Sequence, residues 1–180
     1  MSEIQHQDFN EVLSIIEHGR AKAVHSVNVA LIETYWAVGA YLFRKVAEAG
    51  WGKGVVKELA SWLATRTPGL RGFSAQNLWR MKQFYETYAA DQKLSPLVRD
   101  LNWTHNLIIF SQSKRPKERE FYLRMAIQEK WDKRELEGQI KAALFERAVL
   151  QPAHTSAALT VKAARILPSA FRWYGNGLNS

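Results

Sequence analysis

The sequence predicts an all-α fold, and two observations lead to this prediction. Apolar residues recur at three- and four-residue spacing through nearly every segment up to about residue 150, which is the pattern of amphipathic helices. Glycine and proline interrupt this pattern at Gly50, Pro68, Pro96 and Pro116, where helices are expected to end or begin. Hydrophobic residues make up 47 % of the 180-residue chain, which is enough for a packed core.

The first element is expected to be a long helix from about Gln7 to Ala49. Gly19 predicts a break or kink within it, because glycine costs about 1 kcal/mol relative to alanine inside a helix. The stretch Gly50-Trp51-Gly52 ends the helix. Its apolar positions fall at helical spacing and are Phe9, Val12, Leu13, Ile16, Val24, Val27, Leu31, Tyr35, Val38 and Leu42.

A pair of helices is expected next, at about residues 54–66 and 74–88. Pro68 and Gly69 end the first of them, whose apolar face is Val55, Val56, Leu59, Trp62 and Leu63. Ser74 begins the second as its N-cap, because a hydroxyl there can satisfy an unpaired backbone N–H. The buried stripe of the second helix is predicted to be Leu78, Met81, Tyr85 and Tyr88.

The second helix of the pair also carries a polar row on a different face. Arginine pairs with guanine edges and glutamine with adenine edges, and both side chains also hold phosphate. From Arg66 to Gln83 there are four cations and no Asp or Glu. This pattern predicts a helix-turn-helix-like reader of nucleic acid. The row is Gln76, Arg80, Gln83 and Thr87, flanked by Trp79 and Lys82.

Two considerations weigh against that interpretation. A polar face on a core helix is more simply a solvated surface, although such surfaces usually mix both charge signs. The connector from Thr67 to Phe73 is also longer than the three or four residues of a tight helix-turn-helix.

Further helices are expected towards the carboxyl end. A short helix is predicted around residues 97–101, while residues 104–110 fit either a buried helix or a strand. Residues 117–130 form an amphipathic helix. Asp132 is expected to cap a last helix that reaches Arg147, since a glutamate follows at capping-box spacing.

The chain is expected to divide into one helical domain, residues 1–150, and a linker or poorly ordered basic tail, residues 151–180. From Ala148 to the last residue there is no Asp or Glu. Within the tail, residues 151–156 are expected to be a linker and residues 157–167 a weak helix, with the remainder poorly ordered.

Composition restricts the class of partner and the compartment. The net charge of +8 and a pI near 9.8 favour an anionic partner. The longest strongly apolar run, Leu107 to Phe110, is far too short to cross a membrane, and the amino terminus has no apolar signal core. The chain has no cysteine, which excludes disulfides and thiolate chemistry. We therefore expect a cytoplasmic protein that does not enter a membrane.

No catalytic residue, metal site or cofactor is expected. No two histidines have the spacing of a helical metal site, and no cysteine could complete one. The glycine-rich stretch Gly50 to Gly54 lacks the ending of a phosphate-binding P-loop. Asp91-Gln92-Lys93 has the Asp-x-Lys form of some metal-dependent nucleases, but no strand pattern or upstream Pro-Asp accompanies it.

Several short motifs occur in a fixed order along the chain. The most specific is Gly72-Phe73-Ser74-x-x-Asn77-Leu78-x-x-Met81, and Leu101-Asn102-Trp103-Thr104-His105-Asn106 and Glu118-Arg119-x-x-Phe121-Tyr122 follow it. In this order they resemble the amino-terminal domain of the YhcG-like PDDEXK nuclease family. The resemblance extends from about Phe9 to Leu150.

The resemblance implies a helical DNA-binding domain that precedes a carboxy-terminal nuclease domain. Nothing after Leu150 resembles that nuclease domain, so we expect a truncated, frameshifted or stand-alone form without nuclease activity of its own. A separate nuclease-domain chain is one expected partner. The predicted nucleic-acid-binding residues, most of them carried over by position, are Arg66, Arg71, Ser74, Gln76, Asn77, Arg80, Lys82 and Gln83.

The alternative function is a protein-interaction or homodimerisation module that uses the long first helix. An amphipathic helix of this length can carry more apolar surface than its own domain covers. The residues that suggest it are Val24, Val27, Leu31, Tyr35 and Val38. Both functions can hold together, because helix-turn-helix readers often bind as dimers.

Overall fold

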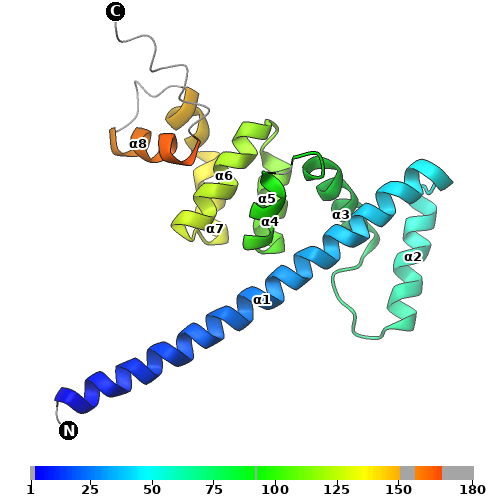
Figure 1. Cartoon of the computed structure of the whole chain (residues 1–180). Coiled ribbons are helices and arrows are strands. Elements are labelled where there is room, and N and C mark those ends of the chain that lie inside the picture. Colours follow the sequence, from blue (N-terminus) through cyan, green and yellow to red (C-terminus); the bar gives the residue numbers. More distant parts are fainter. Residues whose placement is uncertain (1–2, 92, 151–156, 168–180) are drawn as a thin grey trace, which may run out of the picture.

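The structure is a computed structural model that describes residues 3–91, 93–150 and 157–167. Within these residues it contains helices and no strand, so the all-α prediction is confirmed. A long first helix crosses a group of shorter helices (Figure 1). In chain order the elements are α1 (Glu3–Ala49), α2 (Lys53–Arg66), α3 (Ala75–Tyr88), α4 (Leu94–Asp100), α5 (Trp103–Gln112), α6 (Pro116–Glu129), α7 (Lys133–Lys141), the π-helical turn η1 (Glu146–Leu150) and α8 (Ala157–Ile166).

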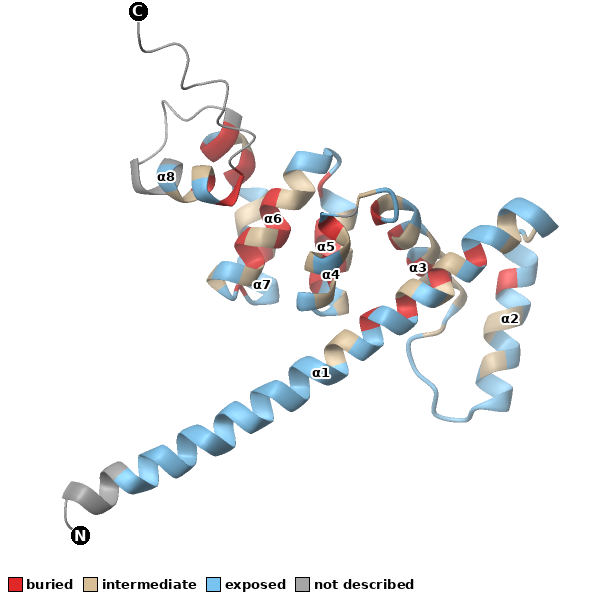
Figure 2. Cartoon of the chain, viewed as in Figure 1, coloured by how far each residue is buried: buried red, intermediate tan, exposed pale blue. Residues whose placement is uncertain are grey.

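Helix α1 is continuous from Glu3 to Ala49, so the break expected at Gly19 is wrong. A single glycine costs a helix only about 1 kcal/mol, and helical residues extend on both sides of this one. Every described side chain from Asp8 to Val27 is exposed (Figure 2). The first half of α1 is therefore an exposed arm, and only its second half enters a core.

Helices α1, α2 and α3 share one hydrophobic core. At its centre Leu42, Val56, Leu78 and Met81 are each at most 1 % exposed. Helices α1 and α3 approach closely because Gly39 has no side chain: a Cβ atom there would lie 2.2 Å from the carbonyl oxygen of Met81. This contact sets how α3 lies against α1.

The buried stripe predicted for α3 is largely confirmed. Leu78, Met81 and Tyr88 are fully buried, whereas Tyr85 is only half-buried. Phe84 was not predicted in this stripe but is also fully buried, where its ring packs edge-on against Trp36, Tyr88 and Trp103. Its burial depends on rings from α1 and α5, which the local sequence of α3 does not reveal.

A second core joins the end of α3 to the helices that follow. Residues 104–110, which fitted helix or strand, lie in the helix α5. The last helix was expected to reach Arg147, but α7 ends at Lys141 and Ala143 has a left-handed φ of 51°. That turn redirects the chain so that Leu144 and Phe145 enter the core.

Helix α8 lies where a weak helix was expected, and Ala163, Ile166 and Leu167 are buried in this second core. The linker expected at 151–156 and the tail end expected at 168–180 lie outside the described residues. No helix in the described part of the chain combines the length and apolar character needed to cross a bilayer.

Replacing Tyr88 with phenylalanine is expected to stabilise the protein by about 1 kcal/mol. The Tyr88 hydroxyl is fully buried and has no hydrogen-bond partner among the described residues, and burial raises its pKa well above the ordinary value. Urea unfolding would measure the change. Tyr122→Phe is the matched control, because the Tyr122 hydroxyl accepts a hydrogen bond from the Phe145 N–H at 3.2 Å. That variant should lose stability. Equal effects from both variants would contradict the conclusion that the Tyr88 hydroxyl is buried without a hydrogen-bond partner in the described part of the chain.

Candidate nucleic-acid interface

The start of α3 is fixed by the connector that precedes it. The Ser74 hydroxyl accepts a hydrogen bond from the Asn77 N–H at 3.3 Å, so the predicted N-cap is confirmed. The Asn77 side-chain amide donates to the carbonyl of Gly72, which has a φ of +89°. The Asn77 amide oxygen accepts from the Trp103 indole N–H at 3.0 Å. The connector, α3 and α5 are thereby tied together at one point.

The outer row of α3 is exposed as its spacing predicted. Gln76, Arg80 and Gln83 are exposed, and no hydrogen bond or ion pair joins their side chains to any other described residue. Thr87, the last member of the predicted row, is half-buried. We call Gln76, Arg80 and Gln83 the α3 outer row. Its arginine carries a positive charge that no carboxylate of the described residues neutralises.

Two other predicted residues have their polar groups engaged by other residues of the chain. The Lys82 ammonium lies 2.8 Å from a Glu86 carboxylate oxygen and 5.6 Å from the centre of the Phe43 ring, and its side chain is only 13 % exposed. The Asn77 amide is held by Gly72 and Trp103, as described above. Neither side chain can reach a ligand without first giving up these contacts.

Arg80 lines an open groove of roughly 250 Å³ between α3, α5 and α7. Lys133 and Glu137 of α7 also line the groove. The Lys133 side chain is 61 % exposed, and its ammonium lies 3.9 Å from a Glu137 carboxylate oxygen across one turn of the helix. The groove therefore adds a partly neutralised cation to the α3 outer row. Its other lining residues are Thr104, Leu107, Ile108, Phe110 and Ser111 from α5.

Thr104, Ser111 and Lys133 were not predicted as residues of the candidate site. The i, i+4 spacing of Lys133 and Glu137 marks an exposed helix face, but it does not show that this face lies beside α3. That proximity comes from the packing of α5 against both α3 and α7.

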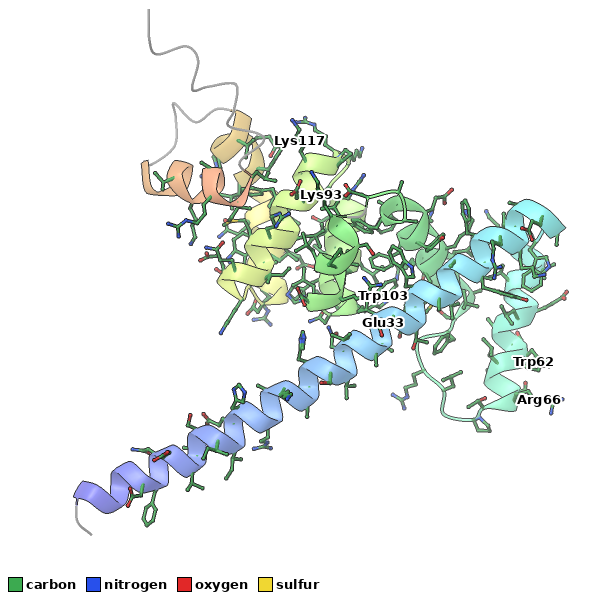
Figure 3. All side chains as sticks on the ribbon, in the orientation of Figure 1. Glu33, Trp62, Arg66, Lys93, Trp103 and Lys117 are labelled. Atoms are coloured by element: carbon green, nitrogen blue, oxygen red, sulfur yellow. The ribbon has the colours of Figure 1, made fainter. Side chains whose placement is uncertain are left out.

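Arg66 and Arg71 lie away from the groove. Arg66 is at the end of α2, with its guanidinium 5.7 Å from the Trp62 ring centre, and both side chains project at the outer edge of α2 (Figure 3). Arg71 is exposed and lines a shallow depression between α2 and the connector, together with Phe73 and Ser74. Arg71 therefore lies beside the start of α3, whereas Arg66 lies at the end of α2.

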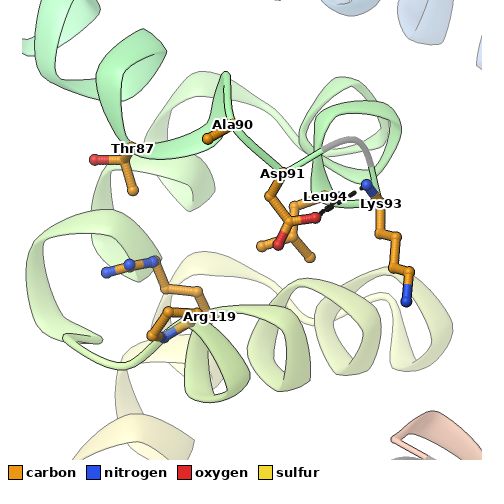
Figure 4. A pocket seen from close by; sticks show the side chains of 7 residues that line it. Thr87, Ala90, Asp91, Lys93, Leu94 and Arg119 are labelled. Atoms are coloured by element: carbon orange, nitrogen blue, oxygen red, sulfur yellow. Dashed lines mark hydrogen bonds between the residues drawn. The ribbon is translucent and has the colours of Figure 1, made fainter.

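A second cationic hollow lies where the loop after α3 meets the start of α6 (Figure 4). Lys93, Arg119 and Asp91 line it, and Lys117 projects nearby (Figure 3). The Arg119 guanidinium donates to the carbonyls of Ser113 and Lys114 at 3.0 and 3.1 Å, which fixes it at the turn before α6. This hollow was not predicted, and it competes with the α3 outer row as a site for anions.

Nothing in the described residues forms a metal centre. No group of three or more His, Asp or Glu residues there could hold an ion. Asp91, from the Asp-x-Lys triplet, accepts hydrogen bonds from the backbone N–H groups of Lys93 and Leu94 at 3.0 and 3.3 Å. Its carboxylate thus supports the turn into α4.

Comparisons with known proteins agree with the resemblance to the amino-terminal domain of the YhcG-like family. The family described as the DUF1016 N-terminal domain matches residues 11–147. No curated protein and no solved structure matches the chain. The matched segment includes all of α2 to α7 and most of α1. The chain therefore belongs to the DUF1016 N-terminal domain family.

Proposed function

We propose that this chain binds duplex DNA through the α3 outer row, and that it serves as the DNA-binding module of a nuclease whose catalytic domain lies elsewhere. The observation that carries the proposal is the exposure of Gln76, Arg80 and Gln83 along one helix face with no carboxylate partner. Arginine and glutamine at this spacing suit both base edges and phosphates.

The surroundings of the row support this proposal. Helix α2 packs against α3 through the shared core at Val56 and Leu78, which gives the pair a fixed geometry. The start of α3 is exposed at Ser74 and Gln76, so backbone N–H groups and the positive end of the helix dipole can approach phosphate. The net charge of +8 adds attraction for an extended polyanion.

The long connector distinguishes this pair from a tight helix-turn-helix. Arg71 lies within the connector and is exposed beside the start of α3. On this proposal Arg71 contacts the DNA backbone while the α3 outer row enters the groove. Because the chain has no cysteine, this function fits the reducing conditions of the cytoplasm.

A salt-titrated binding assay tests the proposal. Purified protein is titrated against labelled duplex DNA, single-stranded DNA and RNA of equal length at several salt concentrations. We expect duplex DNA to bind most tightly and the affinity to fall steeply with salt, because each neutralised phosphate releases counterions. Equal binding of all three polymers would show that the protein binds polyanions through charge attraction without preferring duplex DNA. No binding at low salt would refute the proposal.

A further inference from the structure

The arm of α1 carries an apolar stripe that its own domain does not cover. The side chains from Asp8 to Val27 are all exposed, including Val12, Leu13, Ile16 and Val24, which are 50 % to 71 % exposed. Exposed apolar surface on this scale commonly marks an interaction site.

The stripe lies on one side of the arm, before the part of α1 that packs against the domain. At 100° per residue, Val12, Leu13, Ile16, Val24 and Val27 fall on one side of the helix. Leu42 and Val38, which pack α1 into the core of its own domain, fall on the same side of the helix, so the stripe continues the packed face along the arm. The domain covers this face only in the second half of α1, and the stripe on the first half is exposed.

The helical conformation of the arm has little to stabilise it in a single copy of the chain. It contains Gly19 and several β-branched residues, which lower helix propensity, and Val12, Leu13, Ile16 and Val24 on its apolar face are exposed. Helices in proteins derive most of their stability from packing of such a face. A partner along the stripe would supply that packing.

The charges of the arm indicate which partner fits. Residues 8–17 contain three acids and no Lys or Arg, while residues 18–31 contain Arg20 and Lys22 and no acid. Arg20 lies within the stripe, so a parallel pair of arms would place it against its own copy. An antiparallel pair places it beside Glu17 of the second copy, and each acidic segment lies opposite a basic one.

We infer that two copies of this chain associate through their α1 arms as an antiparallel helix pair centred between His18 and Gly19. In this register Leu13 of one copy packs against Val24 of the other. Arg20 reaches Glu17 of the second copy. Tyr35 and Val38, which the sequence also suggested for pairing, contribute instead to the core of their own copy.

Single-cysteine variants test the inference directly, because the chain has no cysteine of its own. Leu13→Cys and Val24→Cys are prepared separately, and each is oxidised alone and in an equimolar mixture, without nucleic acid. In the antiparallel pair the two copies of position 13 lie about 16 Å apart along the helix axis, because the rise is 1.5 Å per residue. The two copies of position 24 are equally far apart. A disulfide tolerates a Cα separation of only about 7 Å.

We expect covalent dimers in the mixture and few in either variant alone, with sedimentation of the native protein showing a concentration-dependent dimer. Dimers from each variant alone would indicate a parallel pair and overturn the inference. A monomer at all concentrations would overturn it as well. Since no nucleic acid is present, neither result bears on the proposed DNA binding.

Discussion

Replacing Gly39 with alanine is expected to lower the free energy of unfolding by about 3 kcal/mol. A Cβ atom at this position would lie 2.2 Å from the Met81 carbonyl oxygen and 3.0 Å from the Tyr85 Cβ. The first of these neighbours is backbone of α3, so it cannot swing aside as a flexible side chain could. The helices must separate, which opens the core around Leu78 and Met81.

Thermal unfolding followed by circular dichroism would measure this loss, and for a protein of this size it corresponds to a midpoint lower by roughly 10 °C. Gly19→Ala is the matched control, because it makes the same change in the same helix at a site with no atom within 4 Å. Alanine favours the helix there by at most about 1 kcal/mol. If both variants lose stability equally, the close approach of α1 and α3 at Gly39 does not determine the stability of the protein.

Features of the fold that depend on neighbouring residues in the chain were predictable from the sequence. Ser74 and Asp132 act as N-caps, as their types and positions indicated. Gly39, by contrast, could not be identified as the helix crossing, because its role depends on where Met81 of α3 lies. The turn at Ala143 was also missed, since alanine gives no local signal for a left-handed conformation.

In the candidate site, too, features that depend on nearby residues in the chain were predictable, and features that depend on tertiary contacts were not. The α3 outer row follows from helical spacing alone, and the three side chains are exposed. The engagement of Lys82 depends partly on Phe43 of α1, and that of Asn77 on Trp103 of α5. Neither tertiary neighbour can be placed from the sequence of α3.

The polar residues of the motif around Trp103 support the structure rather than a site. The Asn102 side chain accepts from the His105 N–H at 3.0 Å and caps α5, and the buried His105 ring nitrogen Nε2 lies 2.8 Å from the Trp131 carbonyl oxygen. The Asn106 amide donates to the Val98 carbonyl at 2.8 Å. These contacts join α4, α5 and the start of α7, which in turn positions the groove beside Arg80.

Replacing Arg80 with glutamate is expected to weaken the binding of duplex DNA at least about tenfold at low salt, because it removes a contact and adds repulsion. The slope of log affinity against log salt should become shallower by about one. No described residue forms an ion pair with Arg80, so stability should change by less than about 0.5 kcal/mol. Fluorescence anisotropy across a salt series, with urea unfolding alongside, would measure both quantities.

Two variants separate a local contact at Arg80 from a general effect of charge. Arg165→Glu makes the same change in net charge on the exposed face of α8, at the opposite end of the helical group from α2 (Figure 1). Lys82→Ala removes a cation that is already paired with Glu86. Arg165→Glu should alter DNA affinity by less than about threefold, since screening limits distant charges to about 10 Å. Lys82→Ala should weaken binding less than Arg80→Glu, because the Lys82 ammonium is engaged with Glu86. If Arg165→Glu weakens binding as much as Arg80→Glu, the α3 outer row is not the DNA-binding face, and the cationic hollow at Lys93 and Arg119 becomes the surface to test.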